Sequence, residues 1–147
     1  MDNAIISACL LGIPCRYDGQ SKQKFTNKEI EALKAKFNLI PVCPEIYGGL
    51  STPRTGSERV GEGVIMKDGT DVSANFERGA RITLDLCRIL GAKIAILKEK
   101  SPSCGKGQIY DGTFSGTLKG GDGVTAELLM KNGVTVYTES EALGLIE

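Results

Sequence analysis

The chain has 147 residues, 41% of them hydrophobic, and its 18 basic residues balance 18 acidic ones. This length and composition suit a single compact domain, residues 1–147, and the balanced charge gives no field that would attract nucleic acid or a membrane surface. No apolar stretch approaches the ~20 residues of a membrane span, and no secretory leader pattern begins the sequence. We therefore expect a cytoplasmic protein, with neither nucleic acid nor a membrane as its default partner and with an oligomeric state that composition leaves open.

Five cysteines and the absence of histidine limit the available chemistry. An odd number of cysteines in a cytoplasmic chain favours reduced thiols over a disulfide scaffold. Without imidazole, the usual general base near neutral pH and the Ser-His and Cys-His nucleophile pairs are excluded. Acid-base work must therefore fall to carboxylates, Lys, Tyr, Cys or bound water.

The apolar pattern alternates between strand and helix along the chain. Residues 4–8 predict a buried strand, a capping box at Thr26 begins a helix, and residues 39–42 predict a second strand. The Asp68-Gly69 turn indicates a small β-hairpin outside the main sheet. The remaining elements, in order, are a helix at 73–90 that buries Cys87, a strand at 94–97, a Gly- and Ser-rich loop at 99–123, a helix at 124–131, a strand at 134–137 and a short helix capped by Thr138.

Strands that alternate with helices predict βαβ units with right-handed crossovers. The expected fold is α/β, a Rossmann-like three-layer domain with a mainly parallel sheet of about four strands and a small β-hairpin insertion. Sites in such sheets form beyond the carboxyl ends of the strands, where the long loops of this chain begin. The Gly-rich stretches match neither the dinucleotide nor the P-loop fingerprint.

Cys9, Cys43 and Cys104 each lie just past the end of a different predicted strand. Because parallel strands end at one edge of a sheet, these three thiols are expected to converge. Three thiolates can hold a metal centre and leave one coordination position open, as reactive centres do. A fourth thiolate from Cys15 would close the site and favour a structural metal or an electron-transfer cluster, and the spacing does not discriminate between these arrangements.

Two segments place candidate reacting groups beside these thiols. Pro44 favours an extended chain, so Glu45 is expected to face the same space as Cys43 and to act as an acid-base group. Ser101 precedes Cys104 in a Ser-Pro-Ser-Cys turn, where its hydroxyl could bind a ligand or a water. A surface carboxylate and a plain turn are the alternatives. Four loop residues could bind a polar ligand or simply be solvated: Arg16, Tyr17, Asp18 and Arg54.

Short motifs are spaced along nearly the whole chain. They are Ser7-Ala-Cys-Leu-Leu-Gly with Cys15-Arg-Tyr-Asp-Gly19, Cys43-Pro-Glu45 with Gly48-Gly-Leu and Thr52-Pro-Arg54, Asp71-Val-Ser with Phe76 and Gly79-Ala80, Leu97-Lys98 with Ser101-Pro-Ser-Cys-Gly105, and Ile109-Tyr-Asp-Gly-Thr-Phe-Ser-Gly116. In this order and combination they resemble the 2-thiouracil desulfurase family, long catalogued as a domain of unknown function.

The resemblance implies an oxygen-sensitive [4Fe-4S] cluster held by only three cysteines, Cys9, Cys43 and Cys104. The fourth iron would be free to take the sulfur of a thiolated pyrimidine such as 2-thiouracil. It also implies catalytic roles for Glu45, which would pass protons between water and substrate, and for Ser101, which would orient one of them. The implied reaction replaces C=S by C=O with release of sulfide and without net redox.

Two other classes of function stay open. A non-catalytic iron-sulfur or zinc-binding module would use Cys15 as a fourth ligand and would survive Glu45→Gln unchanged. A thiol-redox protein would need paired cysteines, and the sequence has no Cys-x-x-Cys pair to support it.

Overall fold

A four-stranded parallel sheet forms the centre of the computed structural model, which describes residues 1–20 and 23–147. The strand order is β2-β1-β5-β8, and every neighbouring pair runs parallel. The strands are β1 (Asp2–Ser7), β2 (Phe37–Val42), β5 (Ile94–Leu97) and β8 (Thr135–Thr138). All four correspond to the strands that the sequence predicts, and their pairing confirms the mainly parallel sheet.

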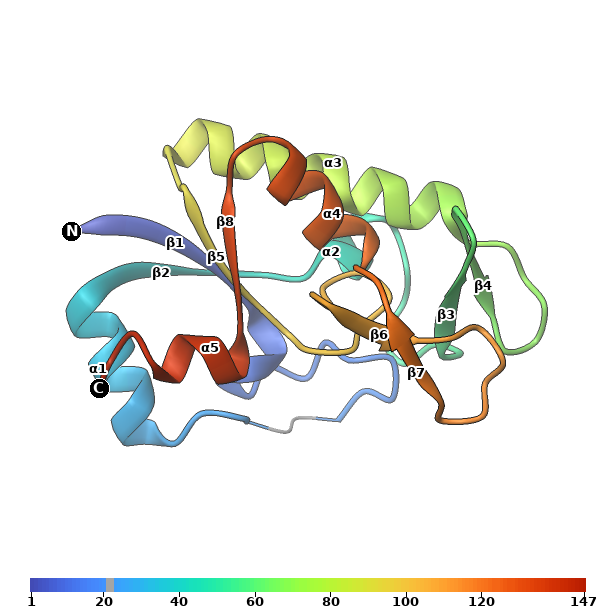
Figure 1. Ribbon diagram of the computed structural model, residues 1–147, viewed down its shortest axis with the longest axis horizontal. Coiled ribbons are helices and arrows are strands. Elements are labelled where there is room, and N and C mark those ends of the chain that lie inside the picture. The colour runs from blue at the N-terminus through green and yellow to red at the C-terminus, as the bar shows by residue number, and fades with distance from the viewer. Residues whose placement is uncertain (21–22) are drawn as a thin grey trace.

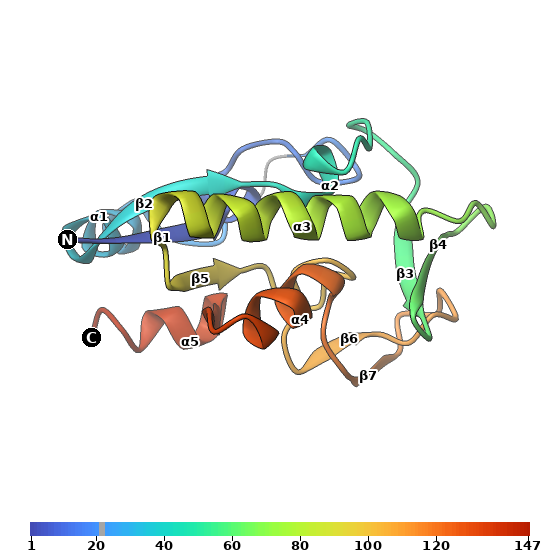
Figure 2. The ribbon, with the colours of Figure 1, turned by 90° about the horizontal axis from the view of Figure 1, so that it is seen from above.

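Helices cover both faces of this sheet (Figures 1 and 2). They are α1 (Asn27–Lys36), α3 (Ser73–Leu90), α4 (Val124–Lys131) and α5 (Glu139–Leu143). Ile5 and Ala95 face one hydrophobic cluster, together with side chains from α3 and α4. Ala4, Ile6 and Ile96 face the other, together with side chains from α1 and α5. This alternation follows from the strand period of two, and it confirms the three-layer α/β arrangement.

The predicted helix boundaries are largely confirmed. The Thr26 hydroxyl accepts from the Glu29 N–H at 3.1 Å, and the Glu29 carboxylate accepts from the Thr26 N–H at 2.9 Å. Thr138 and Glu141 form the same capping box at the start of α5. Gly91 ends α3 in the left-handed conformation at φ +62°, which glycine adopts without strain. None of the helices in the described part of the chain combines the length and apolar character that crossing a membrane requires.

Two β-hairpins lie outside the sheet, beyond the carboxyl ends of its strands (Figure 1). The first pairs β3 (Ser57–Val60) with β4 (Gly63–Met66), and the second pairs β6 (Gln108–Tyr110) with β7 (Leu118–Gly120). The Asp68-Gly69 turn folds the chain back after β4, as the sequence predicts: the Met66 N–H donates to the Thr70 carbonyl at 2.8 Å, and Ile65 forms an antiparallel bridge with Asp71. The turn between β3 and β4 is a separate one, at residues 61–62.

The second hairpin corrects the prediction of a plain loop at residues 99–123. Its strands have three residues each, and only Ile109 among them is buried. Strands this short and this polar leave no alternating apolar pattern that could identify them.

Candidate functional site

A pocket of about 630 Å³ lies at the carboxyl ends of β1, β2 and β5. All five residues that the sequence singled out as site residues line it: Cys9, Cys43, Glu45, Ser101 and Cys104. This volume lies within the ~300–1,000 Å³ that is typical of small-molecule sites.

The sheet places the three thiols directly. Cys9 lies in a single 3-10 turn, η1 (Ala8–Leu11), which follows β1 without a loop. Cys43 follows β2 and is the N-cap of α2 (Pro44–Tyr47), while Cys104 lies in the turn beyond β5. The three strands are neighbours and parallel, so their ends bring together thiols that are far apart in sequence.

Glu45 reaches the pocket by a different route from the one predicted. Cys43 is extended, at φ −138° and ψ 96°, but Pro44 then begins α2 instead of continuing the extended chain. Proline suits the first position of a helix because its fixed φ is helical and its missing N–H needs no partner there. Glu45 therefore lies in the first turn of α2, and it shares the pocket with Cys43 through the helix start.

Close backbone approach fixes α2 against α3. A Cβ atom at Gly79 would overlap the backbone carbonyl of Pro44, and one at Gly48 would overlap that of Asn75. The Asn75 side chain also donates to the Gly48 carbonyl at 2.9 Å. Only glycine allows this contact, which sets the position of the segment that carries Cys43 and Glu45.

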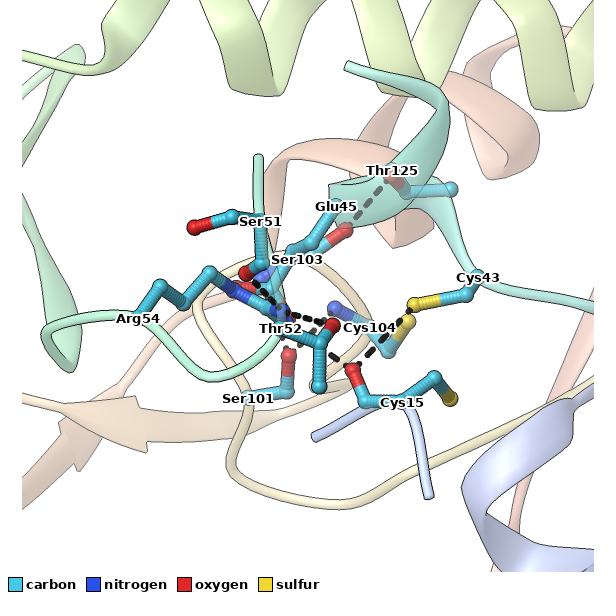
Figure 3. Close-up of polar contacts among 10 residues, drawn as sticks. All are labelled: Cys15, Cys43, Glu45, Ser51, Thr52, Arg54, Ser101, Ser103, Cys104 and Thr125. Atoms are coloured by element: carbon cyan, nitrogen blue, oxygen red, sulfur yellow. Dashed lines mark hydrogen bonds and ion pairs between the residues drawn. The ribbon is translucent and has the colours of Figure 1, made fainter. Parts of the chain in front are cut away.

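The turn that carries Cys104 is held by hydroxyl groups (Figure 3). The Ser101 hydroxyl oxygen accepts from the backbone N–H of Ser103 at 3.1 Å and of Cys104 at 3.0 Å. The buried hydroxyls of Ser103 and Thr125 lie 2.8 Å apart and tie the turn to α4. A side chain at Gly123 would overlap the Ser103 backbone. Both ends of the turn are therefore fixed, with Ser101 at the pocket.

Arg54 is the buried partner of Glu45, a role that the sequence left undecided between ligand contact and solvation. Its Nη2 lies 3.3 Å from Glu45 Oε2 and donates to the Cys15 carbonyl at 3.2 Å. Its Nη1 donates to the Ser51 carbonyl at 3.0 Å and to Thr52 Oγ1 at 3.1 Å (Figure 3). The Arg54 side chain is only 3% exposed, so the guanidinium is a structural link between three segments.

Burial governs the charge state of the ionisable groups. It raises the pKa of the Glu45 carboxyl, while the Arg54 guanidinium opposes this shift. Burial also raises the pKa of Cys9 to about 11, against the lowering effect of nearby Lys98, and that of Cys104 to about 12. Such thiols are protonated at neutral pH and would bind metal with release of protons.

The remaining two cysteines lie in different surroundings. Cys87 is buried among the side chains of the α3 and α4 face, as the sequence predicted. Cys15 lines the pocket next to Cys43, whose Sγ donates to the Cys15 carbonyl at 3.8 Å. The proximity of the two thiols lowers the pKa of Cys43 and raises that of Cys15. Cys15 therefore lies in the same pocket as the three strand-end thiols, although it does not follow a strand of the sheet.

The donor set fits an iron-sulfur cluster. In residues 1–20 and 23–147, no three His, Cys, Asp or Glu side chains are gathered so as to hold a single metal ion. A cluster of several irons makes a different demand, because each of its cysteines binds a different iron. Thiolate ligands with no imidazole are the soft set that iron-sulfur clusters use.

One wall of the pocket consists of residues that the sequence did not single out as site residues. Glu58, Lys98, Tyr110 and Phe114 also line it. Glu58 belongs to a four-residue strand whose pattern does not distinguish it from a surface residue. The Asp-Gly-Thr-Phe-Ser-Gly segment within the family motifs is the one sequence signal that leads to Phe114.

Fold and site together define an α/β protein whose pocket presents three thiols, a carboxylate and a hydroxyl at the carboxyl edge of a parallel sheet. Residues 4–141 match the model of the 2-thiouracil desulfurase family. The chain belongs to this family, which confirms the resemblance of its motifs.

Two relatives extend this assignment. The chain is 40% identical over 147 residues to "Uncharacterized protein YbbK" of Bacillus subtilis (strain 168), covering 93% of this chain and 95% of that protein. It is 48% identical to the solved structure of "[4Fe-4S]-dependent thiouracil desulfidase TudS". The two structures superpose with a TM-score of 0.90 over 99% of this chain and 98% of that one. The α/β fold expected from the sequence is confirmed by this match.

Proposed function

We propose that this chain is a [4Fe-4S]-dependent desulfurase that converts the C=S group of a thiolated pyrimidine such as 2-thiouracil to C=O. The observation that carries the proposal is the convergence of three strand-end thiols with Glu45 and Ser101 in one pocket. Family membership and the relative named as a thiouracil desulfidase support it. The reaction consumes one water and releases one hydrogen sulfide, so it involves no net oxidation or reduction.

Cys9, Cys43 and Cys104 would hold the cluster as thiolates. The chemistry that it supplies when bound is soft Lewis acidity, which binds thiocarbonyl sulfur and makes the adjacent carbon susceptible to water. Lys98 lies close enough to Cys9 to lower its pKa, so its ammonium favours negative charge at this end of the pocket.

Glu45 is the proposed acid-base group. Its side chain is 20% exposed, and Arg54 holds the Oε2 atom. This contact fixes the carboxylate while leaving Oε1 to accept the proton of the attacking water. The same carboxyl then returns a proton as the C–S bond breaks, which is the role that histidine performs in many hydrolases.

Ser101 is the proposed positioning group for water or substrate. Its oxygen accepts from two backbone N–H groups, which fixes the side chain at the pocket. The hydroxyl proton is left to donate, and a donor aimed at the oxygen that forms on the pyrimidine carbon stabilises developing charge there.

The substrate is proposed to be a free small molecule, handled in the cytoplasm by residues 1–147 acting as one domain. The pocket volume of about 630 Å³ suits a cluster with one pyrimidine. Reduced thiols, which the cluster needs, are maintained in that compartment.

A second candidate is a non-catalytic iron-sulfur module that uses Cys15 as a fourth ligand. The observation that favours it is the position of Cys15 in the same pocket, beside Cys43. In such a module Glu45 would have no chemical role.

Anaerobic reconstitution followed by a 2-thiouracil assay tests the proposal. Wild type is expected to form uracil and sulfide in equal amounts. Glu45→Gln is expected to keep its iron and sulfide while kcat falls at least about 100-fold, because general acid-base catalysis is lost. Glu77→Gln, an exposed carboxyl on α3, serves as the control and should behave as wild type. Full cluster loading without uracil formation, or a wild-type rate in Glu45→Gln, would contradict the proposal.

A further inference from the structure

The two hairpins build a wall of the pocket that carries no thiol. We call it the hairpin wall and define it by Glu58 on β3, Tyr110 on β6 and Phe114 in the loop between β6 and β7. β3 and β6 lie close together (Figure 1), although about 50 residues separate them in sequence. All three side chains line the same pocket as Glu45 and the cysteines.

Glu58 is a buried carboxylate with one occupied oxygen. Oε1 accepts from the backbone N–H of Gly112 at 2.9 Å and of Phe114 at 3.1 Å, and the residue is 9% exposed. Oε2 makes no hydrogen bond or ion pair with any residue that the structure describes. Among the described residues, the fully buried side-chain atoms without a hydrogen-bond partner are Nε of Arg54 and Nε of Arg59, and Glu58 Oε2 is not one of them. Oε2 is therefore accessible to solvent, on a residue that lines the pocket.

Water can donate to this oxygen in the free protein, and a ligand that displaces the water must supply a donor in its place. Carboxylates only accept hydrogen bonds, and partial burial without a donor is costly. The ring of a thiolated pyrimidine carries N–H groups directly beside the C=S carbon, and its flat faces can stack on aromatic side chains. Phe114 supplies such a side chain, and its N–H bond to Glu58 couples the two residues in one unit.

We propose that Glu58 Oε2 accepts the hydrogen bond of a ring N–H and thereby orients the pyrimidine, with Phe114 as the adjoining apolar surface. This assignment rests on the proposed function for the class of ligand. Glu58 is a binding and specificity residue, because it accepts a hydrogen bond from the ring N–H that N-alkylated analogues of the thione lack. The substrate class is thereby narrowed to thiolated rings with an unsubstituted N–H at the position that meets Glu58.

Binding of uracil, the expected product, tests this without requiring turnover. Calorimetric titration of the anaerobic holoprotein with uracil, 1-methyluracil and 3-methyluracil gives three dissociation constants per variant. Glu58→Gln keeps a carbonyl oxygen for the Gly112 and Phe114 N–H groups but places an NH₂ group where Oε2 was. Glu62→Gln, an exposed carboxyl at the tip of the same hairpin, is the matched control.

The methyluracil whose methyl group replaces the N–H that meets Glu58 has lost that donor. In wild type and Glu62→Gln it should bind about tenfold more weakly than uracil, as expected for loss of a hydrogen bond to a charged group. In Glu58→Gln, the Kd of uracil should rise about tenfold while the Kd of that methyluracil changes less than twofold. Unchanged uracil binding, equal weakening of all three ligands, or no uracil binding by wild type would overturn the assignment. N–H-dependent uracil binding without desulfuration would overturn the proposed reaction instead.

Discussion

The pocket has two walls that the fold builds in different ways. The cysteine wall, defined by Cys9, Cys43 and Cys104, is made by the ends of three adjacent parallel strands. The hairpin wall depends on two short antiparallel pairs that lie outside the sheet. The cysteine wall follows from the order of the elements along the chain. The hairpin wall requires contacts between segments that are distant in sequence, and no local sequence pattern predicts these contacts.

The two walls are also held by different forces. Behind the cysteine wall lie the two hydrophobic clusters that cover the faces of the sheet. The hairpin wall is supported by a small apolar cluster, in which Val64 of β4 packs with Phe76 of α3, and by Arg59. The Nη2 atom of Arg59 lies 2.7 Å from Glu127 Oε2, and its Nη1 donates to the Asp122 carbonyl at 2.6 Å. Because directional polar contacts have a larger share in the support of the second wall, the two walls should respond differently to mutation.

The largest effect, a loss of stability, is expected from Gly79→Ala, which disrupts the packing of α3 against α2 beside the cysteine wall. The added Cβ would overlap the Pro44 carbonyl, and a backbone group cannot yield as a side chain can. Overpacking of this kind should lower the free energy of unfolding by about 3 kcal/mol, more than the ~1 kcal/mol that alanine gains over glycine in a helix. Urea denaturation measures the difference.

Gly120→Ala is the matched control for this substitution, because a Cβ atom at Gly120 meets no atom within 4 Å. It lies in β7, on the side of the hairpins, and should change the unfolding free energy by less than about 0.5 kcal/mol. Equal destabilisation by the two substitutions would contradict the close-packing account of Gly79.

A smaller effect, seen in catalysis, is expected from Arg54→Lys. Lysine keeps the positive charge but cannot contact Glu45, Cys15, Ser51 and Thr52 from one planar group. Loss of the fixed Glu45 orientation should lower kcat about 100-fold with little change in KM, because misplaced catalytic groups are that costly. Steady-state kinetics with 2-thiouracil measures both. A change confined to KM would mean that Arg54 contacts substrate instead of positioning Glu45.

The smallest effect is expected from Arg59→Met, which loosens the hairpin wall alone. The substitution removes the contacts of Arg59 with Glu127 and with the Asp122 carbonyl, while Glu127 retains its contact with Lys131 at 3.1 Å. Local opening of β3 and β6 should become easier by about 1 kcal/mol, read as faster amide hydrogen exchange in those strands. Exchange in β1 and β5 should stay unchanged, and loss of protection there would show that the walls are not independent.

The difference between the two walls also explains which parts of the fold and the site could be predicted from the sequence. The parallel strands, the capping boxes at Thr26 and Thr138, and the helix from Ser73 to Leu90 follow from local periodicity and local hydrogen bonds, and all are observed. The convergence of Cys9, Cys43 and Cys104 then follows from topology, without any knowledge of side-chain contacts.

The hairpin wall and the surroundings of Glu45 could not be predicted from the sequence. Glu58 meets Gly112 and Phe114, more than 50 residues away, through a strand pair of three residues. Arg54 reaches Glu45 only because the intervening loop folds back. Even at Glu45, the expected extended chain is a helix start, so the residue lines the pocket for a different geometric reason from the one that the sequence suggested.

Iron and sulfide counts after anaerobic reconstitution of single cysteine variants show whether three cysteines hold the cluster. Cys15→Ser should keep the full [4Fe-4S] complement and desulfurate 2-thiouracil. Cys9→Ser, Cys43→Ser and Cys104→Ser should each lose most of the iron, while Cys87→Ser, at the buried thiol outside the pocket, retains it. Loss of the cluster in Cys15→Ser would make Cys15 a fourth ligand and rule out the three-cysteine site.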